Sequence, residues 1–218
     1  MDLRTALRTT GTVRGFTDRP VDPATVVEIL DDARFAPSGG NKQPWRVAVV
    51  DDPTVRGALG AAMRPVWEEY AATTRAGHRP FVLGRSIDGI ATTPVPNTLI
   101  DGILDVPVVL AVAADLSQIA LMDGALDRPA LTGGASVYPF CWNLLLSARA
   151  HGLGGVLTTF LSRREPDVAE VLGLPSGHAL AATVFLGHPV HQPTRLRRRP
   201  VGSFATRDRF DGPAIEGG

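Results

Sequence analysis

Residues 33–50 read ARFAPSGGNKQPWRVAVV, and this stretch joins the end of an expected helix to an expected buried strand. A plain connection needs only turn residues, and its Pro, Ser, Gly and Asn residues are typical of turns. It does not need an amide and an indole on either side of its second proline. Gly39 and the glycine after it would let backbone N–H groups approach a ligand closely. Ser38, Asn41 and Gln43 offer directional hydrogen bonds. The stretch therefore indicates a binding loop, with an elaborate but ligand-free loop as the alternative.

The composition is that of an ordinary globular domain. The chain has 218 residues, of which 44% are hydrophobic and 20% charged, enough for one domain with a full core. Its net charge of zero disfavours binding to nucleic acid or to an anionic membrane. A single cysteine, Cys141, excludes an internal disulfide and fits a reducing cytosol. The first ten residues lack the apolar core of a signal peptide, and the longest apolar run, residues 106–114, is too short to span a bilayer. We therefore expect a cytoplasmic protein without a membrane or nucleic-acid partner.

Apolar residues at helical spacing predict five helices, over residues 2–9, 22–34, 53–74, 136–151 and 162–172. Asp22 is an expected N-cap, with Pro23 at the first helical position. Pro65 should kink the third helix or end its first half. Short apolar runs predict buried strands, over residues 47–50, 105–114, 156–161 and 178–187. Asp123 and its charged neighbours indicate that the ambiguous segment 116–131 is exposed.

Two irregular segments remain. Residues 77–96 are the expected variable loop or lid, because glycines and prolines interrupt the pattern repeatedly. Arg75, Arg79 and Arg85 are possible contacts to an acidic substrate or to the phosphate of a nicotinamide cofactor, although a solvated basic loop is the alternative. Residues 189–218 follow the last strand as an arm that begins with a basic run, and its lack of interleaved aromatic residues disfavours nucleic-acid binding.

The sequence contains no obvious acid–base pair or catalytic triad. Cys141 lies in the middle of an expected apolar helix, where a free cysteine usually packs inertly and is rarely a nucleophile. His188 and His191 lack a second pair of ligands at suitable spacing, so surface histidines are favoured over a metal site. Trp45 is expected to pack in the core. This pattern is consistent with an enzyme whose cofactor carries the chemistry, while the protein supplies binding and orientation.

Three short motifs occur along the chain: TGTVRGFTD (10–18, with Thr12, Arg14 and Phe16), the block 36–45, and Arg198-Arg199-Pro200. In this combination the sequence resembles the nitroreductase family of FMN-dependent oxidoreductases, and the resemblance runs from about residue 7 to residue 212. It implies an α+β fold in which helices flank a central, mostly antiparallel sheet. It also implies one domain over residues 1–218 and an intertwined homodimer, in which residues 204–212 extend over the partner.

The same resemblance implies a cofactor site. Thr12 and Arg14 would bind the phosphate and ribityl chain of FMN, and an arginine of the arm would reach the phosphate. The loop 37–43 would hold the ribityl chain and ring, partly from the second subunit. A glycine pair after the fourth helix would let the backbone lie against the ring. The implied cofactor-binding residues are Thr10, Thr12, Arg14, Pro37, Ser38, Gly39, Asn41, Gln43, Gly154, Gly155, Thr158, Arg198 and Arg199. No metal and no catalytic side chain are implied.

Two positions depart from the family pattern. The family usually has arginine where this chain has Thr10, and often a second basic residue where it has Gly11. A strong bidentate contact to the phosphate is therefore missing. We expect either weaker FMN binding or a replacement of this contact by Arg198 or Arg199.

The implied activity is reduction of FMN by NADH or NADPH, followed by reduction of a nitroaromatic, a quinone or a similar small acceptor in a ping-pong cycle. One alternative is a specialised member of the family, such as a dehalogenase, a heterocycle dehydrogenase or a flavin-fragmenting enzyme. Another is a flavin-binding protein without turnover. The sequence leaves open the acceptor and the choice between NADH and NADPH.

Overall fold

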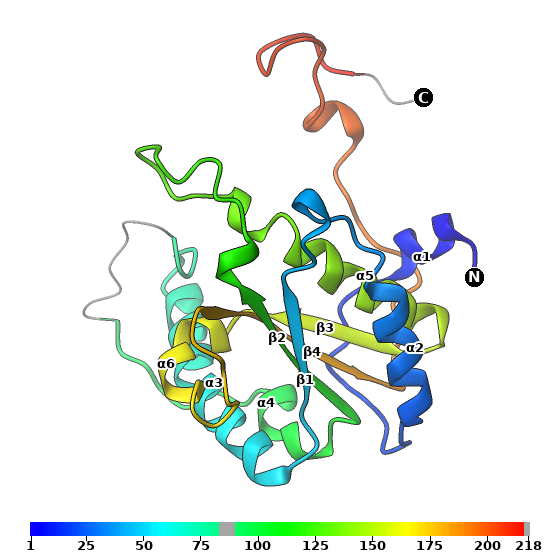
Figure 1. The fold of residues 1–218 in the computed structure, drawn as a ribbon, viewed down its shortest axis with the longest axis vertical. Coiled ribbons are helices and arrows are strands. Elements are labelled where there is room, and N and C mark those ends of the chain that lie inside the picture. Colours follow the sequence, from blue (N-terminus) through cyan, green and yellow to red (C-terminus); the bar gives the residue numbers. More distant parts are fainter. Residues whose placement is uncertain (83–89, 216–218) are drawn as a thin grey trace.

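The computed structural model describes residues 1–82 and 90–215, and its centre is a four-stranded sheet (Figure 1). The strands lie in the order β1-β2-β4-β3, and every neighbouring pair is antiparallel. Their bounds are β1 Trp45–Val49, β2 Val108–Asp115, β3 Gly154–Thr158 and β4 His178–Gly187. The prediction of an α+β fold with a mostly antiparallel sheet is confirmed.

The two central strands are buried on both faces, as their continuous apolar sequences predict. β1, in contrast, is an edge strand of half-buried and exposed residues, so the prediction of a short buried strand over residues 47–50 is wrong for β1 itself. Val49 is exposed because β1 has a strand neighbour on one side only among the described residues. β3 begins two residues before the expected start, and Leu161 lies beyond it in a 3₁₀ turn, Leu161–Arg164.

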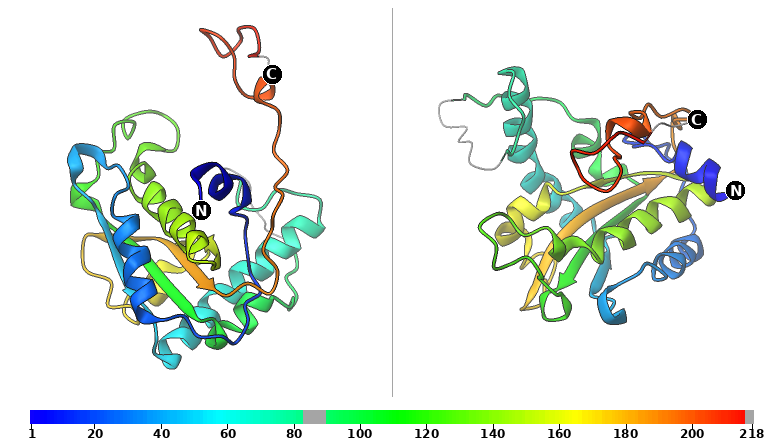
Figure 2. Two further views of the ribbon diagram at one scale, coloured as in Figure 1. Left: turned by 90° about the vertical axis from the view of Figure 1, so that its right-hand side faces the viewer. Right: turned by 90° about the horizontal axis from the view of Figure 1, so that it is seen from above.

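Helices cover both faces of the sheet (Figure 2), with bounds α1 Leu3–Thr9, α2 Pro23–Ala33, α3 Pro53–Arg75, α4 Thr98–Asp101, α5 Val137–Ala150 and α6 Glu165–Val168. Because side chains alternate along a strand, Leu110 and Val184 pack with α2 and α5, whereas Val109 and Phe185 pack with α3 and α4. The predicted cap is confirmed, since the Asp22 carboxylate accepts a hydrogen bond from a backbone N–H of the first turn of α2.

Two helix predictions are corrected. α3 does not end at Pro65 but continues to Arg75, because the buried Met63 and Val66 on either side hold this turn against the core. A kink at Pro65 stays a prediction. The helix expected over 162–172 is reduced to the single turn α6, which follows the 3₁₀ turn and ends well before Gly173.

The segment after β2 is exposed at most of its positions, as predicted, but Asp123 within it is buried. Its carboxylate accepts hydrogen bonds from the backbone N–H groups of Leu131 and Thr132, the Thr132 hydroxyl at 2.6 Å, and the Arg128 guanidinium at 2.7 Å. These donors hold the pKa of Asp123 well below its usual range. A charged side chain can be buried when its hydrogen bonds are satisfied in this way.

The chain after β4 leaves the body of the molecule as an arm, seen at the top of Figure 1. Phe204 and Phe210 are exposed on it. None of the helices in the described parts of the chain has the length and apolar character needed to cross a bilayer. The same residues contain no cluster of three His, Cys, Asp or Glu side chains suited to a metal ion.

Candidate cofactor site

The N-terminal segment lies against β3, and this contact creates the site. Thr12 forms a parallel bridge with Gly155, whose carbonyl oxygen accepts a hydrogen bond of 2.9 Å from the Val13 N–H. A Cβ atom on Gly154 would lie 2.7 Å from a Val13 methyl group, so only glycine permits this approach. The segment therefore brings Thr12 beside the start of β3, with Arg14 two residues further along.

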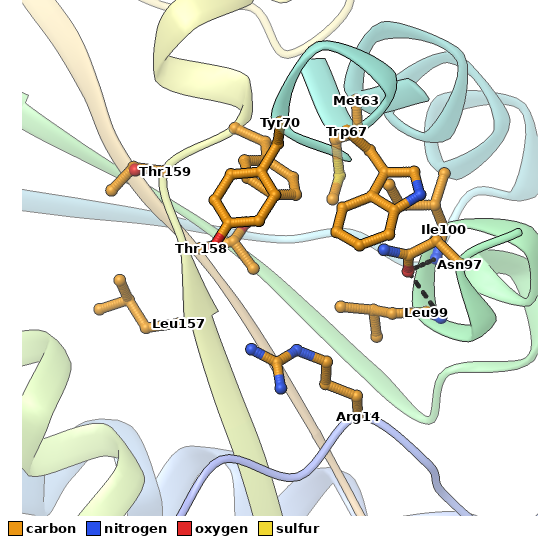
Figure 3. Close-up of a pocket in the computed structure, with 11 residues that line it drawn as sticks. Arg14, Met63, Trp67, Tyr70, Asn97, Leu99, Ile100, Leu157, Thr158 and Thr159 are labelled. Carbon is orange, nitrogen blue, oxygen red and sulfur yellow. Dashed lines mark hydrogen bonds between the residues drawn. The ribbon is translucent and has the colours of Figure 1, made fainter. Parts of the chain in front are cut away.

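Two adjoining cavities follow this contact. The large cavity, of about 530 Å³, is lined by Arg14, Met63, Trp67, Tyr70, Asn97, Leu99, Ile100, Leu157, Thr158, Thr159 and Phe160 (Figure 3). The small cavity, of about 290 Å³, is lined by Thr10, Gly11, Thr12, Trp142, Leu145, Gly155, Val156, Leu157 and Arg198. Leu157 is common to both. The larger volume falls within the usual range for a cofactor or a small organic ligand.

Each cavity offers polar groups to a ligand. Arg14 is the one charged side chain among the described lining residues of the large cavity. Arg198 is the one charged side chain among the described lining residues of the small cavity. The Thr158 hydroxyl is buried and has no hydrogen-bond partner within the described structure. An unpaired buried hydroxyl is costly, and a ligand that bonds to it would remove this cost.

The loop that carries the second motif has an unusual backbone. Gly40, Asn41 and Gln43 have φ angles of 56°, 54° and 48°, in the left-handed region that residues other than glycine rarely adopt. The loop is held by its own side chains, since Ser38 Oγ accepts from the Gln43 N–H at 3.0 Å and Asn41 Oδ1 accepts from Gln43 Nε2 at 3.1 Å. Backbone strain of this kind is concentrated at functional sites.

Within one chain this loop does not reach the cavities. The Gly39 N–H donates to Ser136 Oγ at 3.2 Å, just before α5, and Figure 2 shows α5 between the loop and α1. Neither lining set contains a residue of the loop. The structure therefore gathers six implied site residues, Thr10, Thr12, Arg14, Gly155, Thr158 and Arg198. It leaves outside both lining sets Pro37, Ser38, Gly39, Asn41, Gln43, Gly154 and Arg199.

Residues 7–188 match the family model described as "Nitroreductase family". This chain belongs to the nitroreductase family. It is 32% identical over 202 residues to the NADH dehydrogenase of Thermus thermophilus, and the aligned region covers 92% of this chain and 93% of that protein. It is 30% identical over 199 residues to the 5,6-dimethylbenzimidazole synthase of Rhodospirillum rubrum, with 86% of each chain covered. The crystal structure of a putative nitroreductase in complex with FMN from Desulfovibrio desulfuricans superposes with a TM-score of 0.68 at 21% identity, covering 94% and 95% of the two chains.

The departures from the nitroreductase pattern at residues 10 and 11 have a structural cause. The Thr10 hydroxyl donates to the Ala6 carbonyl at 2.7 Å and so completes the end of α1. A Cβ atom on Gly11 would lie 2.8 Å from Leu196 Cδ2 and 3.0 Å from the Pro193 ring. Gly11 therefore provides the space in which the arm packs, and this packing brings Arg198 into the small cavity.

We expect that Gly11→Arg, which restores a basic residue common in the family, lowers the free energy of unfolding by about 1–2 kcal/mol. It should also weaken FMN binding, because the new side chain displaces Pro193 and Leu196 and with them Arg198. Denaturant unfolding and FMN titration measure the two effects. Gly15→Ala is the matched control, since its Cβ atom would meet nothing closer than 4.0 Å. Tighter FMN binding by Gly11→Arg would contradict this explanation.

The glycine pair after α5 has a packing role of its own. A Cβ atom on Gly155 would lie 2.5 Å from Leu186 Cδ2, 2.8 Å from the Phe185 carbonyl oxygen and 2.9 Å from Leu145 Cδ2. The missing side chain thus permits close contact of β3 with β4 and α5. Contact of the same backbone with the cofactor ring remains a prediction.

Sequence reasoning missed the far side of the large cavity. Trp67 and Tyr70 lie on α3 and contribute their rings, and Phe160 follows β3. Asn97 caps α4, because its Oδ1 accepts from the backbone N–H groups of Leu99 and Ile100 at 3.1 Å each. Two signals could have found these residues: the aromatic pair at i,i+3 near the end of a helix, and an asparagine directly before a short apolar run.

The other candidates are accounted for by packing or by contacts outside the site. Trp45 stacks on Phe140 with ring centroids 4.8 Å apart. Full burial raises the pKa of the Cys141 thiol to about 12, which is far too high for a nucleophile at neutral pH. Arg75 donates to Thr93 Oγ1 at 3.0 Å. Arg79 is exposed, and Arg85 lies outside the described residues.

Proposed function

We propose that this protein is an FMN-dependent NAD(P)H oxidoreductase whose cofactor occupies the two adjoining cavities. The observation that carries the proposal is the convergence of the N-terminal segment, β3 and the arm on two adjoining cavities that share Leu157. Arg198 and Thr12 line the small cavity, and Arg14 and Thr158 line the large one. A phosphate-bearing, flat molecule of the size of FMN fits this distribution, with cationic and hydroxyl groups at one end and a broad cavity at the other.

The chain's residues would bind and orient the cofactor. Arg198 and Thr12 would hold the phosphate, and Arg14 would place a positive charge beside the electron-rich pyrimidine end of the ring. The unpaired Thr158 hydroxyl would bond to a polar edge of the ring. When bound, FMN supplies the redox chemistry, accepting a hydride from NADH or NADPH and passing electrons to a small acceptor in a ping-pong cycle.

The loop 37–43 would complete the site from a second copy of the chain. Its strained, self-bonded backbone is suited to ligand contact, yet it lies away from the cavities of its own chain. A homodimer that places this loop over the partner's cavities would explain the strained backbone, because the loop would then contact the ligand. The exposed arm residues Phe204 and Phe210 would contact the partner in the same assembly.

The names of relatives support this class of reaction without selecting the acceptor. The Thermus relative is named NADH dehydrogenase. The simplest acceptor for electrons taken from NADH would be a nitroaromatic or a quinone that enters the large cavity. The Rhodospirillum relative is named 5,6-dimethylbenzimidazole synthase, so a specialised reaction within the same family is the second candidate. A flavin-binding protein without turnover is the third.

Purification tests the proposal directly. We expect a yellow protein that contains FMN in amounts close to one per chain and elutes as a dimer. Its flavin absorbance should bleach under anaerobic NADH or NADPH and return when a quinone is added. A protein that stays colourless after incubation with FMN overturns the proposal. Bound flavin that neither nucleotide bleaches would support the flavin-binding protein without turnover.

A further inference from the structure

The arm begins beside the N-terminal segment and runs in the opposite direction. The Thr17 N–H donates to the His188 carbonyl at 2.9 Å, and the Val190 N–H donates to the Gly15 carbonyl at 3.0 Å. Residues 191–200 then continue without a helix or a strand. Backbone pairing therefore fixes the start of the arm, but it does not fix the part that carries the arginines.

Gln192 provides the next contact between the two segments. Its Nε2 donates to the carbonyl oxygen of Thr9, the last residue of α1, at 3.1 Å. The same oxygen accepts from the Gly11 N–H at 3.0 Å, so both of its acceptor positions are filled. Within the described structure, no other side chain of residues 191–198 forms a hydrogen bond with residues 1–17. This amide therefore ties the arm to the end of α1.

The other atom of the amide shows that stability alone does not explain this glutamine. Gln192 Oε1 is buried and has no hydrogen-bond partner among the described residues. It lies 3.1 Å from the position that a Cβ atom on Gly154 would take, at the start of β3. A buried acceptor without a donor is unfavourable. A methionine of similar length would fill the space without this cost, so the donor side of the amide is the part that needs a function.

The arm reaches the small cavity six residues after this contact. Pro193 and Leu196 pack over Gly11, and Arg198 lines the cavity. The Arg198 guanidinium donates to the carbonyl of Arg197, its own neighbour, at 2.8 Å, and the residue is exposed. The place of this cation over the cavity is therefore set by the backbone of the arm and by whatever anchors that backbone.

We propose that Gln192 is a positioning residue for the cofactor phosphate: it fixes the arm to α1 and so places Arg198 where the guanidinium contacts the phosphate. Gln192 lies outside both lining sets, so it acts through Arg198 and not by touching the ligand. The pair gives the protein its preference for FMN over riboflavin, which has the same ring and ribityl chain but no phosphate. This inference rests on the proposed function, because it takes the small cavity to hold the phosphate of FMN.

Titration of the flavin-free protein with FMN and with riboflavin, followed by flavin fluorescence, tests the inference. The wild type should bind FMN at least about tenfold more tightly than riboflavin. Gln192→Met should weaken FMN binding by about five- to tenfold and riboflavin binding by less than about twofold. Arg198→Ala should weaken FMN binding by about 10- to 30-fold. In the Arg198→Ala background, Gln192→Met should change FMN affinity by less than about twofold, because the two residues act as one unit.

Two further variants control for a general effect on the fold. Gln118→Met replaces an exposed glutamine after β2 that lies outside both lining sets, and it should change neither affinity by more than about twofold. Gln192→Asn keeps an amide but withdraws the donor by one methylene from the Thr9 carbonyl, so it should reproduce the selective loss of FMN binding. It decides the question if Gln192→Met does not fold.

The outcomes separate the inference from the proposed function. Equal weakening of FMN and riboflavin binding by the Gln192 variants shows a merely structural role and overturns the inference. Unchanged FMN affinity in these variants, or an effect of Gln192→Met that persists in the Arg198→Ala background, also overturns it. A wild type that binds the two flavins equally well refutes the phosphate contact but leaves the flavin enzyme standing. A wild type that binds neither flavin refutes the proposed function and this inference with it.

Discussion

Replacement of Arg14 by alanine is expected to weaken FMN binding by about 10- to 100-fold. Arg14 is the one charged side chain among the described residues of the large cavity, and its guanidinium points into that space (Figure 3). A hydrogen bond from a charged donor to a ligand in a partly enclosed cavity contributes more than a neutral one. Its loss would leave the electron-rich end of the ring without a cationic partner.

Titration of the apoprotein with FMN, followed by flavin fluorescence, measures this effect. Arg14→Lys keeps the charge but not the planar, multiple donors, so it should fall between the wild type and Arg14→Ala. Arg19→Ala removes an exposed arginine of the same segment outside both cavities and should change the affinity by less than about twofold. Unchanged FMN affinity in Arg14→Ala would place the cofactor elsewhere.

Gly155→Ala is expected to lower the free energy of unfolding by about 3 kcal/mol. The added methyl group would lie 2.5 Å from Leu186 Cδ2 and 2.8 Å from the Phe185 backbone oxygen. Both neighbours are fully buried in β4, which pairs on both sides, so they have little freedom to move. Relief of the overlap would have to displace β3.

The same substitution should damage the cofactor site, because Gly155 also bridges Thr12 and accepts a hydrogen bond from Val13. Guanidinium unfolding at one fixed protein concentration measures the stability, since a dimer's stability depends on concentration. Gly57→Ala is the control. Gly57 lies inside α3, where an added methyl group would meet nothing within 4 Å, and the substitution should stabilise the protein by up to about 1 kcal/mol. Equal effects of the two substitutions would show that close packing at Gly155 is not limiting.

The parts of the fold that depend on local sequence are predicted well. α2, with its Asp22 cap and Pro23, and the doubly buried β4 follow from spacing and from residue type. The errors occur where tertiary packing or hydrogen bonds outside the periodic pattern of a helix or strand decide the outcome. Pro65 does not end α3 because core contacts hold the turn. Asp123 is buried because four groups from residues 128–132 bond to it.

The sequence by itself determined the family and the identity of the polar groups near the N-terminus and in the arm, because these are encoded in short motifs. The resemblance to that family implied the antiparallel α+β class. Only the tertiary structure decided which of these groups meet. It placed Arg198 beside Thr12 through the packing of the arm on Gly11, and it kept the loop 37–43 on the other side of α5. It alone assembled Trp67, Tyr70 and Phe160 into one wall, because contacts between residues distant in the chain depend on how the sheet and helices pack.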